Sequence, residues 1–224
     1  MSKIKERINL IERGLSNLKS TDNSVKIIAV SKKKSSKDIK EAFEAGISNF
    51  GENYLQEALG KINELKDLGI SWHFVGKIQS NKCKEIAENF NWVHTIDRYK
   101  VASLLEKYCP KNKIIYGLIQ VNIDNEDTKS GIAPEEVKTM LKELKSLKKI
   151  KIIGLMILPA VNGLNKEAIS PFTRIKKLLL DLQEENPNLK ELSMGMSKDY
   201  EMAIKEGSTI VRLGESIFGK REKK

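Results

Sequence analysis

Lys32 is the first residue whose type and position suggest covalent chemistry. It follows residues 25–30, an apolar and β-branched segment that predicts a strand. Side chains alternate between the two faces of a strand, so Lys32 shares a face with Ile28, whereas Lys33 faces the other way. Burial and nearby cations lower the pKa of a lysine, which makes its amine available for Schiff-base formation. The alternative is that the three lysines beginning here form a solvated surface segment.

Arg212 is the second residue of this kind. It lies within residues 209–213, an apolar segment that predicts another strand. A buried guanidinium needs partners, because leaving its charge uncompensated costs several kcal/mol. Two explanations remain open at this point. Arg212 either forms a structural ion pair with a neighbouring glutamate or acts as a fixed cation directed at a ligand.

Two glycine-containing turns are candidates for anion binding. Residues 195–197 (Gly-Met-Ser) and 214–216 (Gly-Glu-Ser) each lie between a predicted strand and a predicted helix start. Backbone N–H groups at such turns, together with the N-terminal ends of helices, bind phosphate and other anions. Glycine is also common in ordinary turns, so each turn by itself has a structural explanation.

The elements that must position these residues alternate along the chain. The predicted strands comprise residues 25–30, 47–50, 71–75, 92–96, 114–123, 150–158, 189–194 and 209–213. The predicted helices comprise residues 4–18, 36–44 (with Ser36 as the N-cap), 53–67, 80–89, 166–185 and 197–206, and two that begin near residues 97 and 134. Such alternation implies parallel strands joined by crossover helices.

Eight strand–helix units predict an α/β fold, specifically a single (β/α)8 TIM-type barrel with an extra N-terminal helix. An open doubly wound sheet is the alternative, because the spacing of elements does not show closure. In a (β/α)8 barrel the loops at the C-terminal ends of the strands form the active site, and phosphate often binds after strands seven and eight. The barrel would therefore place Lys32 and the two glycine turns at one end.

The composition excludes several classes of protein. Of the 224 residues, 40% are hydrophobic, which is enough for a globular core. No apolar segment approaches the roughly 18 residues of a membrane span, and the charged N-terminus does not resemble a secretory signal. Two cysteines, Cys83 and Cys109, are too few for a disulfide framework or a cysteine-rich zinc site. We expect one cytoplasmic domain over residues 1–224, with an N-terminal helix within residues 1–20, a basic tail at residues 220–224, and no metal or membrane.

The formal net charge of +10 indicates either nucleic acid or a small anionic ligand as a binding partner. Aromatic residues make up only 6% of the chain, and no nucleic-acid-binding motif is present. Nucleic acid is therefore not the expected partner. We expect a monomer that binds a small anionic molecule.

The motifs of the chain, taken in order, resemble those of the pyridoxal phosphate homeostasis protein family, a single-domain relative of the alanine racemase barrel. The resemblance covers residues 25–219. The segments that show it are residues 28–32 (IAVSK), 49–54 (NFGENY), 72–76 (WHFVG), 78–82 (IQSNK), 94–97 (HTID), 129–131 (KSG), 154–156 (GLM), 192–199 (LSMGMSKD), 207–209 (GST), 211–214 (VRLG) and 217–219 (IFG).

This resemblance implies pyridoxal 5′-phosphate (PLP) as the cofactor. Lys32 would hold PLP as an aldimine, Asn53 would lie beside its ring, and Arg212 would face the pyridine nitrogen. Ser197 and the backbone of Gly214 and Glu215 would hold the phosphate. No catalytic residue is implied. The family also connects lysines near Lys129 with transfer of the cofactor, so PLP-dependent apo-enzymes are expected protein partners.

The function implied is PLP binding in intracellular vitamin B6 homeostasis without substantial turnover. An arginine at the pyridine nitrogen keeps that nitrogen unprotonated, which weakens the ring as an electron sink. Racemisation also requires two bases on opposite faces, and in the alanine racemase relatives the second base comes from an additional β-domain that is not expected here. The alternative is a PLP-dependent amino-acid racemase or decarboxylase.

Overall fold

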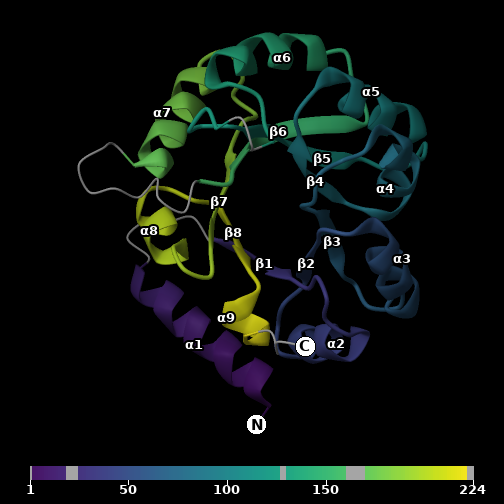
Figure 1. Cartoon of the computed structure of the whole chain (residues 1–224), viewed down its shortest axis with the longest axis vertical. Helices are drawn as coiled ribbons and strands as arrows, with labels where there is room; N and C mark the ends of the chain where they lie inside the picture. Colours follow the sequence, from purple (N-terminus) through teal and green to yellow (C-terminus); the bar gives the residue numbers. More distant parts are fainter. Residues whose placement is uncertain (1, 19–24, 127–129, 160–169, 221–224) are drawn as a thin grey trace.

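The computed structural model describes residues 2–18, 25–126, 130–159 and 170–220, and every structural statement below refers to these residues. Eight parallel strands form a closed barrel in sequence order (Figure 1). The strands are β1 Lys26–Val30, β2 Asn49–Glu52, β3 Ser71–Phe74, β4 Trp92–Ile96, β5 Ile115–Val121, β6 Ile150–Ile157, β7 Glu191–Met196 and β8 Ile210–Leu213.

The predicted barrel is confirmed, and the open sheet is excluded by one strand pair. β1 pairs with β8 in parallel, with Lys26 opposite Ile210 and Ala29 opposite Leu213. This pair closes the sheet between the first and last strands, so neither strand is left with an open edge.

Helices surround the barrel as the alternating pattern predicts. They are α1 Lys3–Leu18, α2 Ser36–Glu44, α3 Leu55–Glu64, α4 Cys83–Asn89, α5 Tyr99–Tyr108, α6 Val137–Leu144, α7 Pro171–Gln183, α8 Tyr200–Lys205 and α9 Glu215–Phe218. Short 3-10 turns at Ser80–Lys82 and Pro134–Glu136 precede α4 and α6. The start of the helix predicted at residues 166–185 lies partly outside the described residues. Among the described helices, none combines the length and the apolar character needed to span a membrane.

The N-cap of α2 differs from the prediction by one residue. Ser35, not Ser36, caps the helix: its hydroxyl accepts a hydrogen bond from the backbone N–H of Asp38 at 3.2 Å. The carboxylate of Asp38 in turn accepts from the Ser35 backbone N–H at 2.9 Å. This reciprocal capping box requires an acidic or amide side chain three residues after the cap, and only Ser35 has one.

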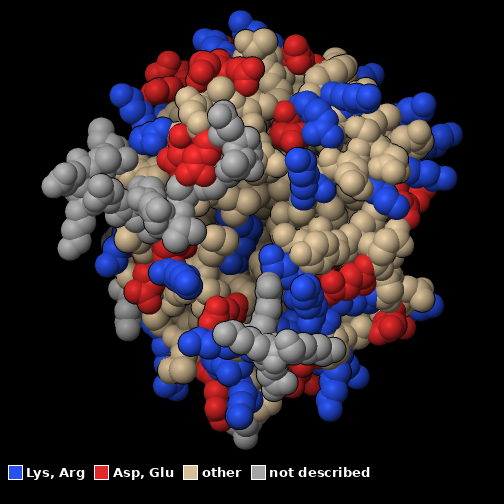
Figure 2. Space-filling view, viewed as in Figure 1, with Lys and Arg blue, Asp and Glu red and all other residues tan. Residues whose placement is uncertain are grey.

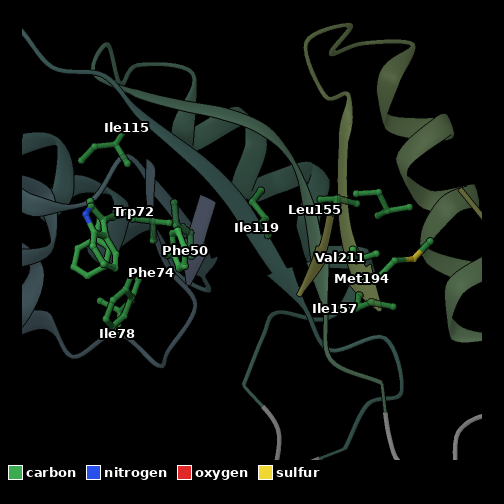
Figure 3. Close-up of a cluster of buried hydrophobic side chains, with 14 of the residues drawn as sticks. Phe50, Trp72, Phe74, Ile78, Ile115, Ile119, Leu155, Ile157, Met194 and Val211 are labelled. Atoms are coloured by element: carbon green, nitrogen blue, oxygen red, sulfur yellow. The ribbon is translucent and has the colours of Figure 1, made fainter. Parts of the chain in front are cut away.

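Most buried apolar side chains lie between the strands and the surrounding helices. Phe50, Trp72, Phe74, Ile119 and Leu155 belong to this outer layer (Figure 3). A second, much smaller cluster consists of strand residues only and fills part of the barrel interior. Its buried members are Ile28, Trp92, Leu118, Met156 and Ile210. Since Ile28 lies in the interior, the alternation of β1 directs Val30 and then Lys32 along the inward face.

The N-terminal helix α1 packs against the outside of the barrel, beside α2, α8 and α9 (Figure 1). Ile4, Ile8, Ile11 and Leu15 recur every three or four residues and are all buried. This spacing places them on one face of the helix. The apolar face of α1 is therefore covered by this chain itself.

Candidate functional site at the C-terminal end of the barrel

Lys32 follows β1 and is half-buried in a cavity of about 280 Å³. The structure brings it together with two other predicted site residues, because the cavity is lined by Val30, Lys32, Lys34, Gly214, Glu215 and Gly219. Figure 2 shows Lys and Arg side chains within and beside a hollow at the centre of the ring of strands. Lys32 thus lines a cavity, and the interpretation of this lysine as part of a fully solvated surface segment is not supported.

The three consecutive lysines have different environments. Lys33 is exposed and has a positive φ of 61°, which favours glycine or asparagine in other proteins. The amine of Lys34 lies 3.4 Å from the carbonyl oxygen of Phe218. Lys32 and Lys34 both line the cavity, and Lys34 directs its amine to the Phe218 carbonyl, whereas Lys33 does not line the cavity.

A buried polar cluster holds the backbone on both sides of Lys32. The amine of Lys61 donates to the carbonyl of Ser31 and to Glu52 Oε1, both at 2.8 Å. The Ser31 hydroxyl donates to the same carboxylate oxygen at 2.6 Å. Glu57 accepts from Lys61 and from the backbone N–H of Lys33. Helix α3 therefore fixes the end of β1.

Sequence reasoning missed this cluster, although two signals were present. Glu57 and Lys61 are four residues apart on a predicted helix, and Glu52 follows the strand predicted at residues 47–50. Glu52 is fully buried. Burial raises the pKa of its carboxyl, and hydrogen bonds from Lys61 and Ser31 offset part of that effect.

Asn53 follows β2 and contributes an unsatisfied polar atom to this end of the barrel. Its Oδ1 is buried and has no hydrogen-bond partner among the described residues. Its backbone carbonyl lies so close to Gly76 that a Cβ at Gly76 would sit 2.1 Å from the oxygen. Buried amide oxygens are almost always hydrogen-bonded, so this one indicates a place for a donor from outside the chain.

The two predicted glycine turns meet through Ser197. Its hydroxyl oxygen accepts the backbone N–H of Gly214 at 3.3 Å and that of Ser216 at 3.1 Å. In the first turn Gly195 has a φ of +92°, and a Cβ there would lie 2.7 Å from Ala203 Cβ, so glycine is required. The turns after β7 and β8 thus form a single polar surface.

A second cavity of about 380 Å³ adjoins this surface and shares Glu215 and Gly219 with the Lys32 cavity. It is lined by Arg7, Ser197, Lys198, Glu215, Ser216, Gly219 and Lys220. Backbone N–H groups, hydroxyls and cations are the donors that a phosphate prefers. The donor set at the end of β7 and β8 therefore suits a phosphate group.

Arg212 is buried in β8, two residues before Gly214. Its Nη1 donates to Ser193 Oγ at 2.6 Å, and its Nη2 donates to the carbonyl of Ile157 at 2.9 Å. No carboxylate within the described residues forms an ion pair with it, so the glutamate pair considered from the sequence is not observed. Burial lowers the pKa of Arg212 to about 10, with Asp199 opposing the shift. Arg212 is thus a cation at neutral pH, held by neutral oxygens.

Comparison with known proteins identifies the family. The family described as alanine racemase, N-terminal domain, matches residues 7–222. The chain is 46% identical over 200 residues to the pyridoxal phosphate homeostasis protein of Pseudomonas aeruginosa, covering 89% of this chain and 86% of that protein. The chain belongs to the pyridoxal phosphate homeostasis protein family. The Haemophilus influenzae protein of the same name is 41% identical over 227 residues, covering 97% of this chain and 96% of that protein.

Solved structures share the fold of this chain. PipY of Synechococcus elongatus with PLP bound superposes with a TM-score of 0.84 at 33% identity, covering 97% of this chain and 100% of that chain. Alanine racemase of Corynebacterium glutamicum has a TM-score of 0.72 at 17% identity, and the match covers 97% of this chain but 61% of the racemase. The likeness to the racemase concerns the fold alone.

In this member of the pyridoxal phosphate homeostasis protein family, the six predicted site residues all lie at or just after the C-terminal ends of strands. Lys32, Gly214 and Glu215 line one cavity, and Ser197 and Glu215 line the adjoining one. Asn53 and Arg212 lie at the ends of β2 and β8, the two strands that flank β1. Lys129 and most of the basic tail lie outside the described residues. Their predicted roles therefore stay predictions.

Proposed function

We propose that this chain binds PLP at the C-terminal end of the barrel and acts in intracellular vitamin B6 homeostasis. The observation that supports this most directly is that Lys32 shares one cavity with Gly214 and Glu215, beside the donors around Ser197. A lysine and a group of donors that suit a phosphate thus lie at one end of the barrel. The names of the curated relatives and the PLP-bound structure of PipY agree with this proposal.

The residues present fit the cofactor. PLP supplies an aldehyde that reacts with amines and a pyridine ring that withdraws electrons. The amine of Lys32 would bind the aldehyde. The amide of Asn53, whose Oδ1 has no partner among the described residues, would lie beside the ring. Ser197 and the backbone of Gly214 and Glu215 would hold the phosphate.

Arg212 favours binding over turnover. A guanidinium has only donors, and a pKa of about 10 keeps this one protonated at neutral pH. A pyridine nitrogen that accepts a hydrogen bond from it stays unprotonated, which weakens the ring as an electron sink. We propose that the chain holds PLP without substantial turnover. The alternative class is an amino-acid racemase or decarboxylase.

A carrier of this kind acts by releasing its cofactor. We propose that the protein works as a monomer in the cytoplasm and delivers PLP to PLP-dependent apo-enzymes. Light scattering of the purified protein tests the monomer. Mixing the PLP-loaded protein with an apo-enzyme tests delivery, because activity of the apo-enzyme would recover without added PLP.

The decisive experiment traps the attachment site. Purified protein is loaded with PLP, reduced with borohydride and digested, and the modified peptide is identified by mass. Modification is expected on Lys32 and is lost in Lys32→Ala. The matched control is Lys33→Asn, which removes the neighbouring exposed amine and tolerates a positive φ. Modification spread over several surface lysines in the wild-type protein would contradict the proposed site.

The same preparations separate a carrier from an enzyme. PLP-loaded protein is incubated with a panel of small amino acids, and enantiomers and decarboxylation products are quantified. Little or no product is expected. Robust PLP-dependent turnover that disappears in Lys32→Ala would support the racemase or decarboxylase alternative.

A further inference from the structure

A continuous line of polar side chains crosses the barrel interior. His73 Nε2 lies 3.1 Å from Asn49 Oδ1, and His73 Nδ1 lies 3.0 Å from His94 Nε2. His94 Nδ1 lies 3.0 Å from Ser193 Oγ, which accepts from Arg212 Nη1 at 2.6 Å. We call these five residues the interior relay. They come from β2, β3, β4, β7 and β8.

The interior relay is unusual for its location. Barrel interiors are normally filled by branched apolar side chains. Here both histidines and Ser193 are fully buried, and buried polar groups are unfavourable unless every donor and acceptor has a partner. The relay therefore needs an explanation beyond filling space.

The chemistry of Arg212 sets the direction of the hydrogen bonds at one end. A guanidinium can only donate, so Ser193 Oγ accepts from it. Among the described residues, the Ser193 hydroxyl proton then has one acceptor within reach, Nδ1 of His94. His94 Nδ1 is consequently unprotonated, and in a neutral ring the proton is on Nε2. The reverse direction would leave the Ser193 proton buried without an acceptor from the described part of the chain.

The direction continues to the other end of the relay. The Nε2–H of His94 donates to His73 Nδ1, and the Nε2–H of His73 donates to Asn49 Oδ1. Asn49 is oriented for this role, since its Nδ2 donates to the hydroxyl of Ser48 at 3.2 Å. Each ring nitrogen thus has one role, and both rings are neutral. Burial, which lowers the pKa of both histidines well below the usual range, agrees with neutral rings.

The relay also determines what Arg212 can do. Ser193 donates its proton to His94, so its oxygen presents only lone pairs to the guanidinium, and such donation makes an oxygen a better acceptor. With the Ile157 carbonyl as the second acceptor, two of the guanidinium nitrogens are fixed. The guanidinium is thereby kept protonated and held in one orientation without a carboxylate.

We propose that Ser193, His94 and His73 are positioning residues that orient Arg212 and maintain it as a hydrogen-bond donor toward the cofactor. This inference rests on the proposed PLP function. Its specific content is that a neutral, one-directional hydrogen-bond relay through the barrel core sets the state of the cofactor's ring nitrogen. None of the three residues needs to touch the cofactor.

The first test needs no cofactor. Long-range proton–nitrogen NMR correlations of histidine-labelled protein report which ring nitrogen carries the proton, and the chain has only two histidines. Both are expected to be neutral with the proton on Nε2 at pH 7. A proton on Nδ1 of either ring, or a charged ring, would overturn the relay.

The second test asks whether the relay acts on bound PLP. Ser193→Ala removes the acceptor of Arg212 Nη1 and the donor to His94. We expect PLP affinity to fall about tenfold, as for loss of one charge-assisted hydrogen bond, together with a changed absorption spectrum of bound PLP. Ser193→Thr keeps the hydroxyl and is expected to restore the spectrum.

A matched control separates positioning from general destabilisation. Val93 is fully buried beside His94 but packs in the outer layer, so Val93→Ala weakens the core without touching the relay. It is expected to lower stability and leave the spectrum unchanged. If Ser193→Ala binds PLP with the wild-type spectrum and affinity, the positioning role is wrong while the proposed function stands. If wild-type protein does not bind PLP at Lys32, the proposed function fails, and the NMR result still decides the relay.

Discussion

The hydroxyl oxygen of Ser197 lies 3.1 Å from the backbone nitrogen of Ser216, and this contact joins the turn after β7 to the turn after β8. The same oxygen accepts from Gly214 at 3.3 Å. A neutral hydroxyl thus occupies the point at which two backbone N–H groups converge. Such a point also suits an oxygen of a phosphate group.

Replacing Ser197 tests this surface. Ser197→Ala is expected to weaken PLP binding about tenfold, because it removes a hydroxyl donor to a charged phosphate. The stability of the fold should change by no more than about 1 kcal/mol, since Ser197 is only half-buried. Fluorescence titration with PLP measures the affinity. Ser146→Ala, an exposed serine that follows α6, is the control, and equal affinities of the two variants would contradict the assignment.

The cluster beneath Lys32 makes a strong stability prediction. Lys61→Met would leave the fully buried Glu52 without its cation, and removing one partner of a buried ion pair costs about 3–5 kcal/mol. Urea denaturation at pH 7 measures the loss. Adding Glu52→Gln to this variant removes the uncompensated charge and should recover much of the stability. If the double variant is no more stable than Lys61→Met alone, the loss of stability does not come from the uncompensated charge of Glu52.

The two buried histidines predict acid sensitivity. Their pKa values are lowered in the folded protein by burial, whereas in the unfolded chain histidine titrates near pH 6.5. The unfolded state therefore binds more protons below about pH 6.5, and stability falls as the pH decreases. Two such groups lower the free energy of unfolding by at most about 2.7 kcal/mol for each pH unit of acidification.

Denaturation curves recorded between pH 7.5 and about pH 5 measure this slope. Glu52 acts in the opposite sense, because its raised pKa adds stability as the pH falls toward its unfolded-state value. Its effect is confined to pH values above about 4.5 and comes from one group. A stability that stays constant from pH 7 to pH 5.5 would contradict two neutral buried rings.

Gly76 and Gly60 form a matched pair of substitutions. A Cβ at Gly76 would lie 2.1 Å from the Asn53 carbonyl oxygen, so Gly76→Ala must displace the backbone of Asn53 and should cost about 1–3 kcal/mol or more. Gly60 lies within α3, where a Cβ would meet no neighbouring atom of the described residues within 4 Å. Gly60→Ala should therefore stabilise the helix by up to about 1 kcal/mol. Thermal unfolding distinguishes the two variants. If Gly76→Ala neither lowers the stability nor changes the PLP affinity, the close contact between Gly76 and Asn53 has no role in the site.

The sequence by itself determined the elements and the faces that they present. Short apolar and β-branched segments, each followed by a helical pattern, predicted eight strands and the helices between them, with ends that the structure shifts by a few residues. The alternation of β1 also indicated that Lys32 and Lys33 lie on opposite faces, because strand geometry depends only on local backbone structure. That the face of Lys32 is the inward one followed only from the interior position of Ile28. The resemblance of the motifs, which the comparisons confirm, indicated the family and its cofactor.

Tertiary structure alone decided which inward and outward residues meet. Closure depends on the pairing of β1 with β8, and the contact between His94 and Ser193 joins residues 99 positions apart. Local periodicity contains no information on such distances, because the register and curvature of the closed sheet set them. For the same reason the partners of Arg212, a serine and a backbone carbonyl instead of a glutamate, became apparent only once the barrel was closed.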